Sequence, residues 1–98
     1  MHIGMHRYSH RVISRYKGKA VFELWNEPNG RNPRPHNMPA QNYAALLTSV
    51  GQMFQNDSAV VLVAGATAGV DPGYIADLGP AALSYVLTLA FSNPTGVF

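Results

Sequence analysis

A short segment in the first third of the chain places a carboxyl group, an amide and a large aromatic ring side by side. It reads Trp25-Asn26-Glu27-Pro28-Asn29 and follows a run of strand-forming residues. A Glu27 carboxyl walled by Trp25 and a proline-rich loop would have its charged form disfavoured by desolvation, as a general acid requires. The segment also has a simpler interpretation, because Asn, Pro and Gly are common in turns that follow strands.

Histidines and glycines offer two further chemistries. His2, His6 and His10 are four residues apart, so on a helix their imidazoles would share one face and could bind a metal ion. A solvated helix face explains the same spacing, since no carboxylate or fourth ligand accompanies them, and we predict no metal site and no cofactor. The glycines of residues 64–69 lack the Gly-x-Gly-x-x-Gly spacing that cradles phosphates, which argues against nucleotide binding.

Composition indicates a single globular domain. The 98 residues are 47% hydrophobic and 12% charged, with no Cys, which excludes disulfides and cysteine nucleophiles. No apolar run approaches the roughly 18 to 20 residues of a membrane span. The start of the chain has no apolar signal-peptide core, so we expect a soluble protein with no secretory signal and an undetermined compartment.

Charge is distributed unevenly along the chain. The first nineteen residues carry five cations and no acid, whereas the remainder carries two cations and five acids. Such a basic segment could bind nucleic acid, but cations also suit the C-terminal end of a helix dipole. Because only two or three of them can share one helix face, we predict no nucleic-acid partner.

Apolar periodicity and turn residues divide the chain into alternating helices and strands. Helices are expected at residues 5–17, 42–55 and 71–78, and strands at 20–25, 59–64 and 83–91. The second strand is apolar without alternation, which is typical of strands buried on both faces of a parallel sheet. The order predicts an α/β fold with about three parallel strands and right-handed crossovers.

Local signals predict where these elements end. Gly18 occupies the position of a left-handed cap after the first helix, and Asp71-Pro72 is a good N-cap and first-turn pair. We expect the second strand to end in a turn at Gly65-Ala66, and Gly79-Pro80 to stop the third helix.

The segment from Phe22 to Asn29 resembles the end of the fourth strand in clan A glycoside hydrolases, the retaining β-glycosidases built on (β/α)8 barrels. The residues Tyr43-Ala-Ala-Leu-Leu47 on the next helix agree with this resemblance. Within the clan, the chain is most similar to the family of β-xylosidases and α-iduronidases. The resemblance implies that residues 1–98 are a single truncated segment of a TIM barrel, from its third helix to its sixth strand.

The resemblance also implies residue roles. Glu27 would be the general acid/base in hydrolysis of a β-glycosidic bond, and Asn26 would bond the sugar 2-hydroxyl. Trp25 and Asn29 would contact the carbohydrate substrate beside them. An alternative is a non-catalytic carbohydrate-binding or structural piece of a larger hydrolase.

Glycoside hydrolysis needs a second carboxyl group, about 5 to 9.5 Å from the first depending on stereochemistry. Glu23 and Glu27 would be roughly 13 Å apart along a strand, which is too far. Asp57 precedes a strand, on the opposite edge, and Asp77 lies within a helix. Asp71 alone follows a strand on the same edge as Glu27, although N-capping explains it too. The resemblance puts the family's nucleophile on a seventh strand, which this chain does not reach.

Three possibilities stay open for a chain of this length. It could be a fragment of a longer enzyme, an inactive relic that still binds sugar, or a homo-oligomer in which copies complete a barrel-like core. Open edges of apolar parallel strands motivate the homo-oligomer.

Overall fold

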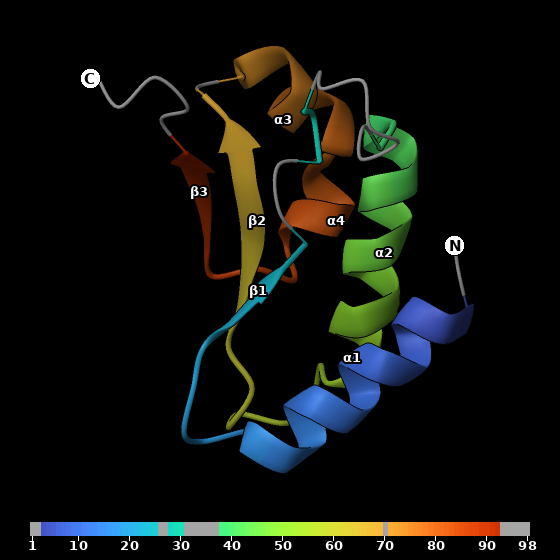
Figure 1. Cartoon of the computed structure of the whole chain (residues 1–98), viewed down its shortest axis with the longest axis vertical. Helices are drawn as coiled ribbons and strands as arrows, with labels where there is room; N and C mark the ends of the chain where they lie inside the picture. The colour runs from blue at the N-terminus through green and yellow to red at the C-terminus, as the bar shows by residue number, and fades with distance from the viewer. Residues whose placement is uncertain (1–2, 26–27, 31–37, 70, 93–98) are drawn as a thin grey trace.

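The computed structural model describes residues 3–25, 28–30, 38–69 and 71–92 (Figure 1). The elements are α1 (Ile3–Tyr16), β1 (Phe22–Leu24), α2 (Ala40–Met53), β2 (Leu62–Ala68), α3 (Pro72–Leu78), α4 (Pro80–Leu83) and β3 (Thr88–Ser92). The expected alternation of helices and strands is therefore confirmed, with one additional short helix.

The three strands form one parallel sheet in the order β1-β2-β3. The helices that connect them, α2 and the pair α3 and α4, lie on the same side of this sheet (Figure 1). Right-handed crossovers produce this arrangement when every new strand is added in the same direction. The predicted α/β class with parallel strands is confirmed. Across the described residues the strands form an open sheet and no closed barrel.

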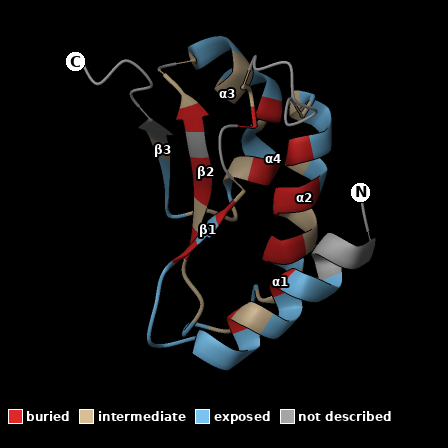
Figure 2. Ribbon diagram, in the orientation of Figure 1, coloured by how far each residue is buried: buried red, intermediate tan, exposed pale blue. Residues whose placement is uncertain are grey.

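Helix α2 supplies more residues to the described core than any other element. Its apolar stripe, predicted from the sequence, is buried against the sheet at Tyr43, Leu46, Leu47 and Val50 (Figure 2). The sheet contributes alternate residues to the same core, so that Phe22 and Leu24 are buried while Glu23 between them is exposed. This alternation follows from the two-residue repeat of a strand.

Helix α1 is attached to the rest of the fold at its C-terminal end. Gly18 adopts a left-handed φ of 80°, which confirms the predicted cap, and its N–H donates to the Ala59 carbonyl at 3.1 Å. Lys17 forms an ion pair with Asp57 at 2.7 Å. Both contacts join α1 to the connection between α2 and β2.

The bounds predicted for the second strand are wrong. Residues 57–60 form a turn, in which the Asp57 carboxylate accepts the Ala59 N–H, so β2 begins only at Leu62. The strand then continues through the Gly65-Ala66 step, where a turn was expected, and its register against β3 shifts between Ala64 and Thr67. Gly65 and Ala66 therefore lie in an irregularity of the ladder and do not form a turn.

The bounds of the third strand are also wrong. Pro80 does not only end α3 but occupies the first turn of α4, where its missing N–H costs nothing. Gly79, with a φ of 85°, provides the sharp change of direction between the two helices. The strand β3 consequently begins at Thr88, five residues later than predicted.

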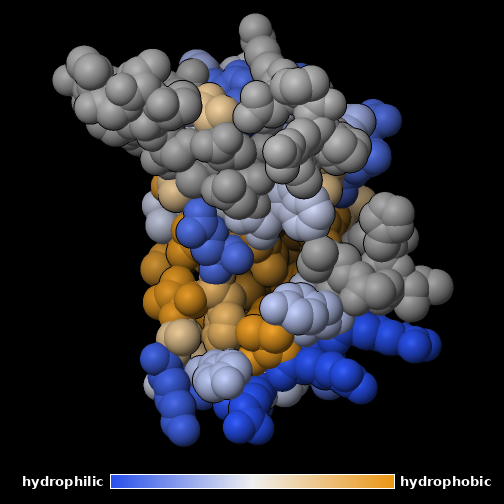
Figure 3. Space-filling view, viewed as in Figure 1, coloured by the Kyte–Doolittle hydropathy of each residue, from blue (hydrophilic) through white to orange (hydrophobic). Residues whose placement is uncertain are grey.

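Part of the sheet surface is apolar and exposed. Figure 3 shows an apolar area over the strands, bordered by hydrophilic side chains. Val21 and Leu87, which precede the outer strands, are 59% and 74% exposed. None of the helices in the described ranges is both long enough and apolar enough to cross a membrane.

Candidate functional site

The first described residue of the predicted site, Trp25, has an unusual backbone. It directly follows β1 and has a φ of 68°, the one positive φ of a non-glycine residue in the described part of the chain. Such a conformation is strained for a bulky aromatic residue and commonly marks functional sites. The Trp25 side chain is half-buried and packs against the core. Asn26 and Glu27 come next and lie outside the described residues.

A buried tyrosine joins the ends of β1 and β2 beside this junction. The Tyr43 hydroxyl donates to the Leu24 carbonyl oxygen at 2.5 Å and accepts the Gly65 N–H at 2.6 Å. Burial is the main cause that raises the pKa of Tyr43 far above its ordinary value of 10.0. The hydroxyl therefore stays protonated at neutral pH and can donate to the Leu24 carbonyl.

Asn29 is bonded to the end of β2 rather than turned toward solvent. Its side-chain oxygen accepts the Ala68 N–H at 2.7 Å, while its amide nitrogen donates to the Ala68 carbonyl at 3.4 Å. The same nitrogen donates to Asp71 Oδ2 at 2.7 Å. The side-chain amide of Asn29 thus bonds to both backbone groups of Ala68 at the end of β2. The predicted contact of Asn29 with sugar stays a prediction.

Asp71 has the N-capping role that the sequence suggested. Its Oδ1 accepts the N–H of Tyr74 at 3.1 Å at the start of α3, and its Oδ2 accepts the Asn29 amide. The Tyr74 hydroxyl donates to the Met38 carbonyl at 2.7 Å, and burial, helped by the charge of Asp71, raises the pKa of Tyr74 to about 12. Whether Asp71 also acts as a second carboxylate stays a prediction.

Three of the five predicted site residues are therefore described, and all three lie at the carboxyl ends of β1 and β2. They are Trp25, Asn29 and Asp71, and a hydrogen bond joins two of them although they are 42 residues apart in sequence. Asp57, which was excluded as a partner for Glu27, lies at the opposite edge in its ion pair with Lys17.

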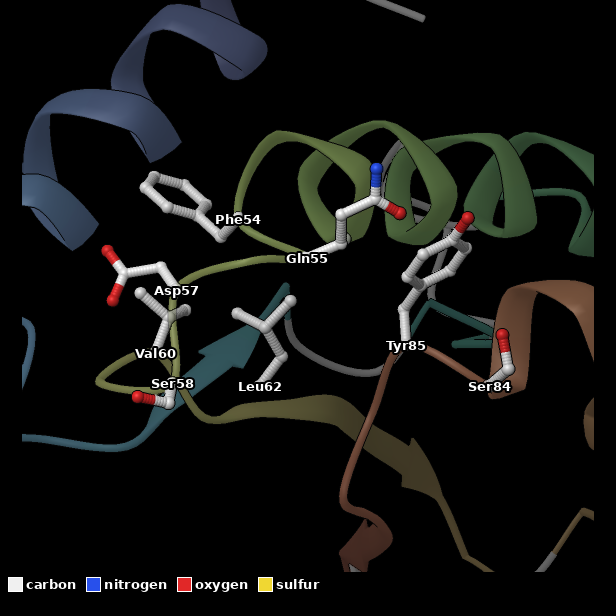
Figure 4. A pocket seen from close by; sticks show the side chains of 9 residues that line it. Phe54, Gln55, Asp57, Ser58, Val60, Leu62, Ser84 and Tyr85 are labelled. Carbon is white, nitrogen blue, oxygen red and sulfur yellow. The ribbon is translucent and has the colours of Figure 1, made fainter.

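Two pockets lie at the amino-terminal edge of the sheet, away from the predicted site. The first has a volume of about 420 Å³ and lies between the C-terminal end of α2 and the connection that enters β3 (Figure 4). Its polar and aromatic lining includes Phe54, Gln55, Ser58 and Tyr85. Sequence analysis missed it, because Tyr85 was taken as part of a strand and residues 84–86 are a loop.

The second pocket, of about 520 Å³, adjoins the first on the side of α1 and shares Phe54 and Asp57 with it. His10 contributes to its lining and stacks on the Phe54 ring, with the ring centroids 5.8 Å apart. Of the other two histidines of the predicted metal-binding face, His2 and the side chain of His6 lie outside what the structure describes. In the described ranges, no group of three or more His, Cys, Asp or Glu side chains is placed to hold a metal ion.

Comparison of the chain with protein-family models, with curated proteins and with solved structures finds no significant match. The functional assignment therefore depends on the chemistry of the residues at the carboxyl edge of the sheet.

Proposed function

We propose that the protein is a glycoside hydrolase that cleaves β-glycosidic bonds, with Glu27 as the general acid/base. The observation that carries the proposal is the conformation of Trp25. A strained aromatic residue at the carboxyl end of β1 directly precedes the Asn26-Glu27 pair. In barrels of parallel strands, catalytic groups gather at this end of the strands.

The winding of the sheet supports a barrel origin. A (β/α)8 barrel adds each parallel strand beside the previous one and keeps all its helices on the outer side. The order β1-β2-β3 with α2, α3 and α4 on one side has the same sense of winding, whereas a doubly wound fold reverses the order. We infer that the sheet corresponds to about three strands of a TIM-type barrel.

In the proposed reaction, Glu27 donates a proton to the glycosidic oxygen as the bond to the leaving sugar breaks. It then acts as a base and removes a proton from the attacking water. Asn26 would bond the sugar 2-hydroxyl, and Trp25 would form one wall of the site. Asp71 remains the candidate for the second carboxylate among residues that follow a strand at this edge.

The decisive experiment compares an aryl β-glycoside, the dinitrophenyl glycoside, with an alkyl β-glycoside. Glu27→Gln should lower hydrolysis of the alkyl glycoside by about 10²- to 10⁴-fold, because its leaving group needs protonation. Hydrolysis of a dinitrophenyl glycoside should fall much less, because that leaving group departs as an anion. Glu23→Gln, a matched change on the exposed face of β1, should leave all rates unchanged. Equal rates for Glu27→Gln and the unmodified protein would reject the proposal.

One observation favours a second candidate function, the binding of carbohydrate without hydrolysis. Both carboxylate oxygens of Asp71 already accept hydrogen bonds from the protein. In that case a β-linked oligosaccharide should bind saturably, binding should be lost in Trp25→Ala, and no sugar should be released. Released sugar above the level of the Glu27→Gln variant would exclude this candidate.

A further inference from the structure

We propose that Tyr43 is a positioning residue for the Trp25-Asn26-Glu27 segment, because its hydroxyl bonds to the backbone of both strands where β1 ends. This inference rests on the proposed function for its consequence in catalysis, but its structural part is independent of any activity.

The register of the two strands shows which backbone groups the hydroxyl contacts. Phe22 pairs with Leu62 and donates its N–H to the Val61 carbonyl at 2.9 Å, as a residue in a parallel ladder does. Two residues later Leu24 pairs with Ala64, so its carbonyl should accept the N–H of Gly65. The Tyr43 hydroxyl bonds to both of these groups, because it donates to the Leu24 carbonyl and accepts the Gly65 N–H.

The inserted hydroxyl is held rigidly. Tyr43 is 1% exposed, and its ring packs in the core on the buried face of α2. Its hydroxyl gives a buried partner to one backbone acceptor and one backbone donor, which belong to different strands. A side chain from a helix therefore ties the ends of β1 and β2 together.

The chain leaves the sheet at this point. After Leu24, the backbone turns through the positive φ of Trp25. Gly65 makes this turn possible from the other strand, because a Cβ there would collide with the carbonyl oxygens of Leu24 and Trp25. The hydroxyl on one side and the glycine on the other define the direction in which the segment starts. Asn26 and Glu27 follow Trp25 directly in the sequence, which is why the proposed function depends on this junction.

The structural part is tested by nuclear magnetic resonance. In the unmodified protein, Trp25 should give the strong intraresidue cross-peak between amide and α protons that marks a positive φ. In Tyr43→Phe, the Leu24 carbonyl and the Gly65 N–H lose their shared partner and the end of β1 is held less firmly, so this cross-peak should weaken. A weak cross-peak at Trp25 in the unmodified protein, which needs no substitution, would overturn the inference, as would a strong one that persists in Tyr43→Phe.

Two control variants separate positioning from a general loss of stability. Tyr85→Phe removes a hydroxyl from a half-buried ring at the opposite edge and should leave the Trp25 signal unchanged. Val50→Ala opens the same core while keeping the Tyr43 hydroxyl, so it should lower stability without moving the signal. A shifted Trp25 signal in Val50→Ala would show that any weakening of the core has this effect, and would overturn the inference.

The catalytic part is tested with the glycosides described above. Tyr43→Phe should lower kcat by about 10- to 100-fold with little change in KM, as expected for a misplaced acid/base group. An unchanged kcat beside a weakened Trp25 signal would overturn the role in positioning. If the unmodified protein hydrolyses nothing, the proposed function fails, while the Trp25 signal still decides the structural part.

Discussion

The two edges of the sheet use their polar groups in different ways. At the carboxyl edge, the side chains of Tyr43, Asn29 and Asp71 bond to backbone groups and to each other across different elements. At the amino-terminal edge, an exposed ion pair and two open pockets occupy the surface. Both pockets thus lie away from the strained, polar junction, at the edge that in barrels serves stability.

The largest expected effect on stability tests the amino-terminal edge. A Cβ on Gly51 would collide with Cβ and Cγ of Tyr85, atoms that cannot move without the backbone. Gly51→Ala should therefore destabilise the fold by about 3 kcal/mol from overpacking, the upper end of the usual range, partly offset by about 1 kcal/mol of helix propensity. Urea denaturation would measure the change.

Gly73→Ala provides the control for this substitution. The nearest atom to a Cβ at Gly73 is Asp71 Oδ1 at 3.9 Å, an ordinary contact, so the variant should be neutral or slightly stabilised. If Gly51→Ala also abolished glycoside hydrolysis while remaining folded, the division of roles between the two edges would be wrong.

An intermediate effect is expected at the carboxyl edge. Asp71→Ala removes the N-cap of α3 and the partner of Asn29, and should lower the free energy of unfolding by about 0.5 to 2 kcal/mol. Asp77→Ala removes an exposed carboxylate from the same helix and should change it little. Equal stability of both variants, measured by thermal unfolding, would show that the hydrogen bonds of Asp71 with Asn29 and Tyr74 do not stabilise the fold.

The smallest effect concerns the ion pair at the amino-terminal edge. The hydrogen bond from Lys17, followed by that from the Ala59 N–H, lowers the pKa of the Asp57 carboxyl from its ordinary value of 3.8. Its contribution to stability is therefore present above pH 3.8 and lost as the pH falls through the lower pKa of the folded state.

This ion pair is exposed, so salt should weaken it. The carbon chemical shift of the Asp57 carboxyl, followed during acid titration, should report a higher pKa in Lys17→Met than in the unmodified protein. Identical titration curves for the two proteins would show that the contact is absent in solution.

Local chemistry accounted for several parts of the fold. The stripe of Tyr43, Leu46 and Leu47 predicted α2, and Gly18 and Asp71 predicted two helix ends, because capping depends on residues within one turn. The bounds of β2 and β3 were wrong, because apolar residues such as Val60 and Leu83 fit a turn or a short helix as readily as a strand. Their pairing partners decide which they adopt.

The sequence by itself determined the helix faces, the caps, the parallel α/β order and the candidate segment at Trp25-Asn26-Glu27. Only the tertiary structure decided that the Tyr43 hydroxyl bonds to both Leu24 and Gly65, and that Asn29 bonds to Asp71. The physical reason is the distance along the sequence between the residues that interact. Caps and periodic faces arise from contacts within a few residues, whereas these hydrogen bonds join groups 19 to 42 residues apart that meet only when α2 packs on the sheet.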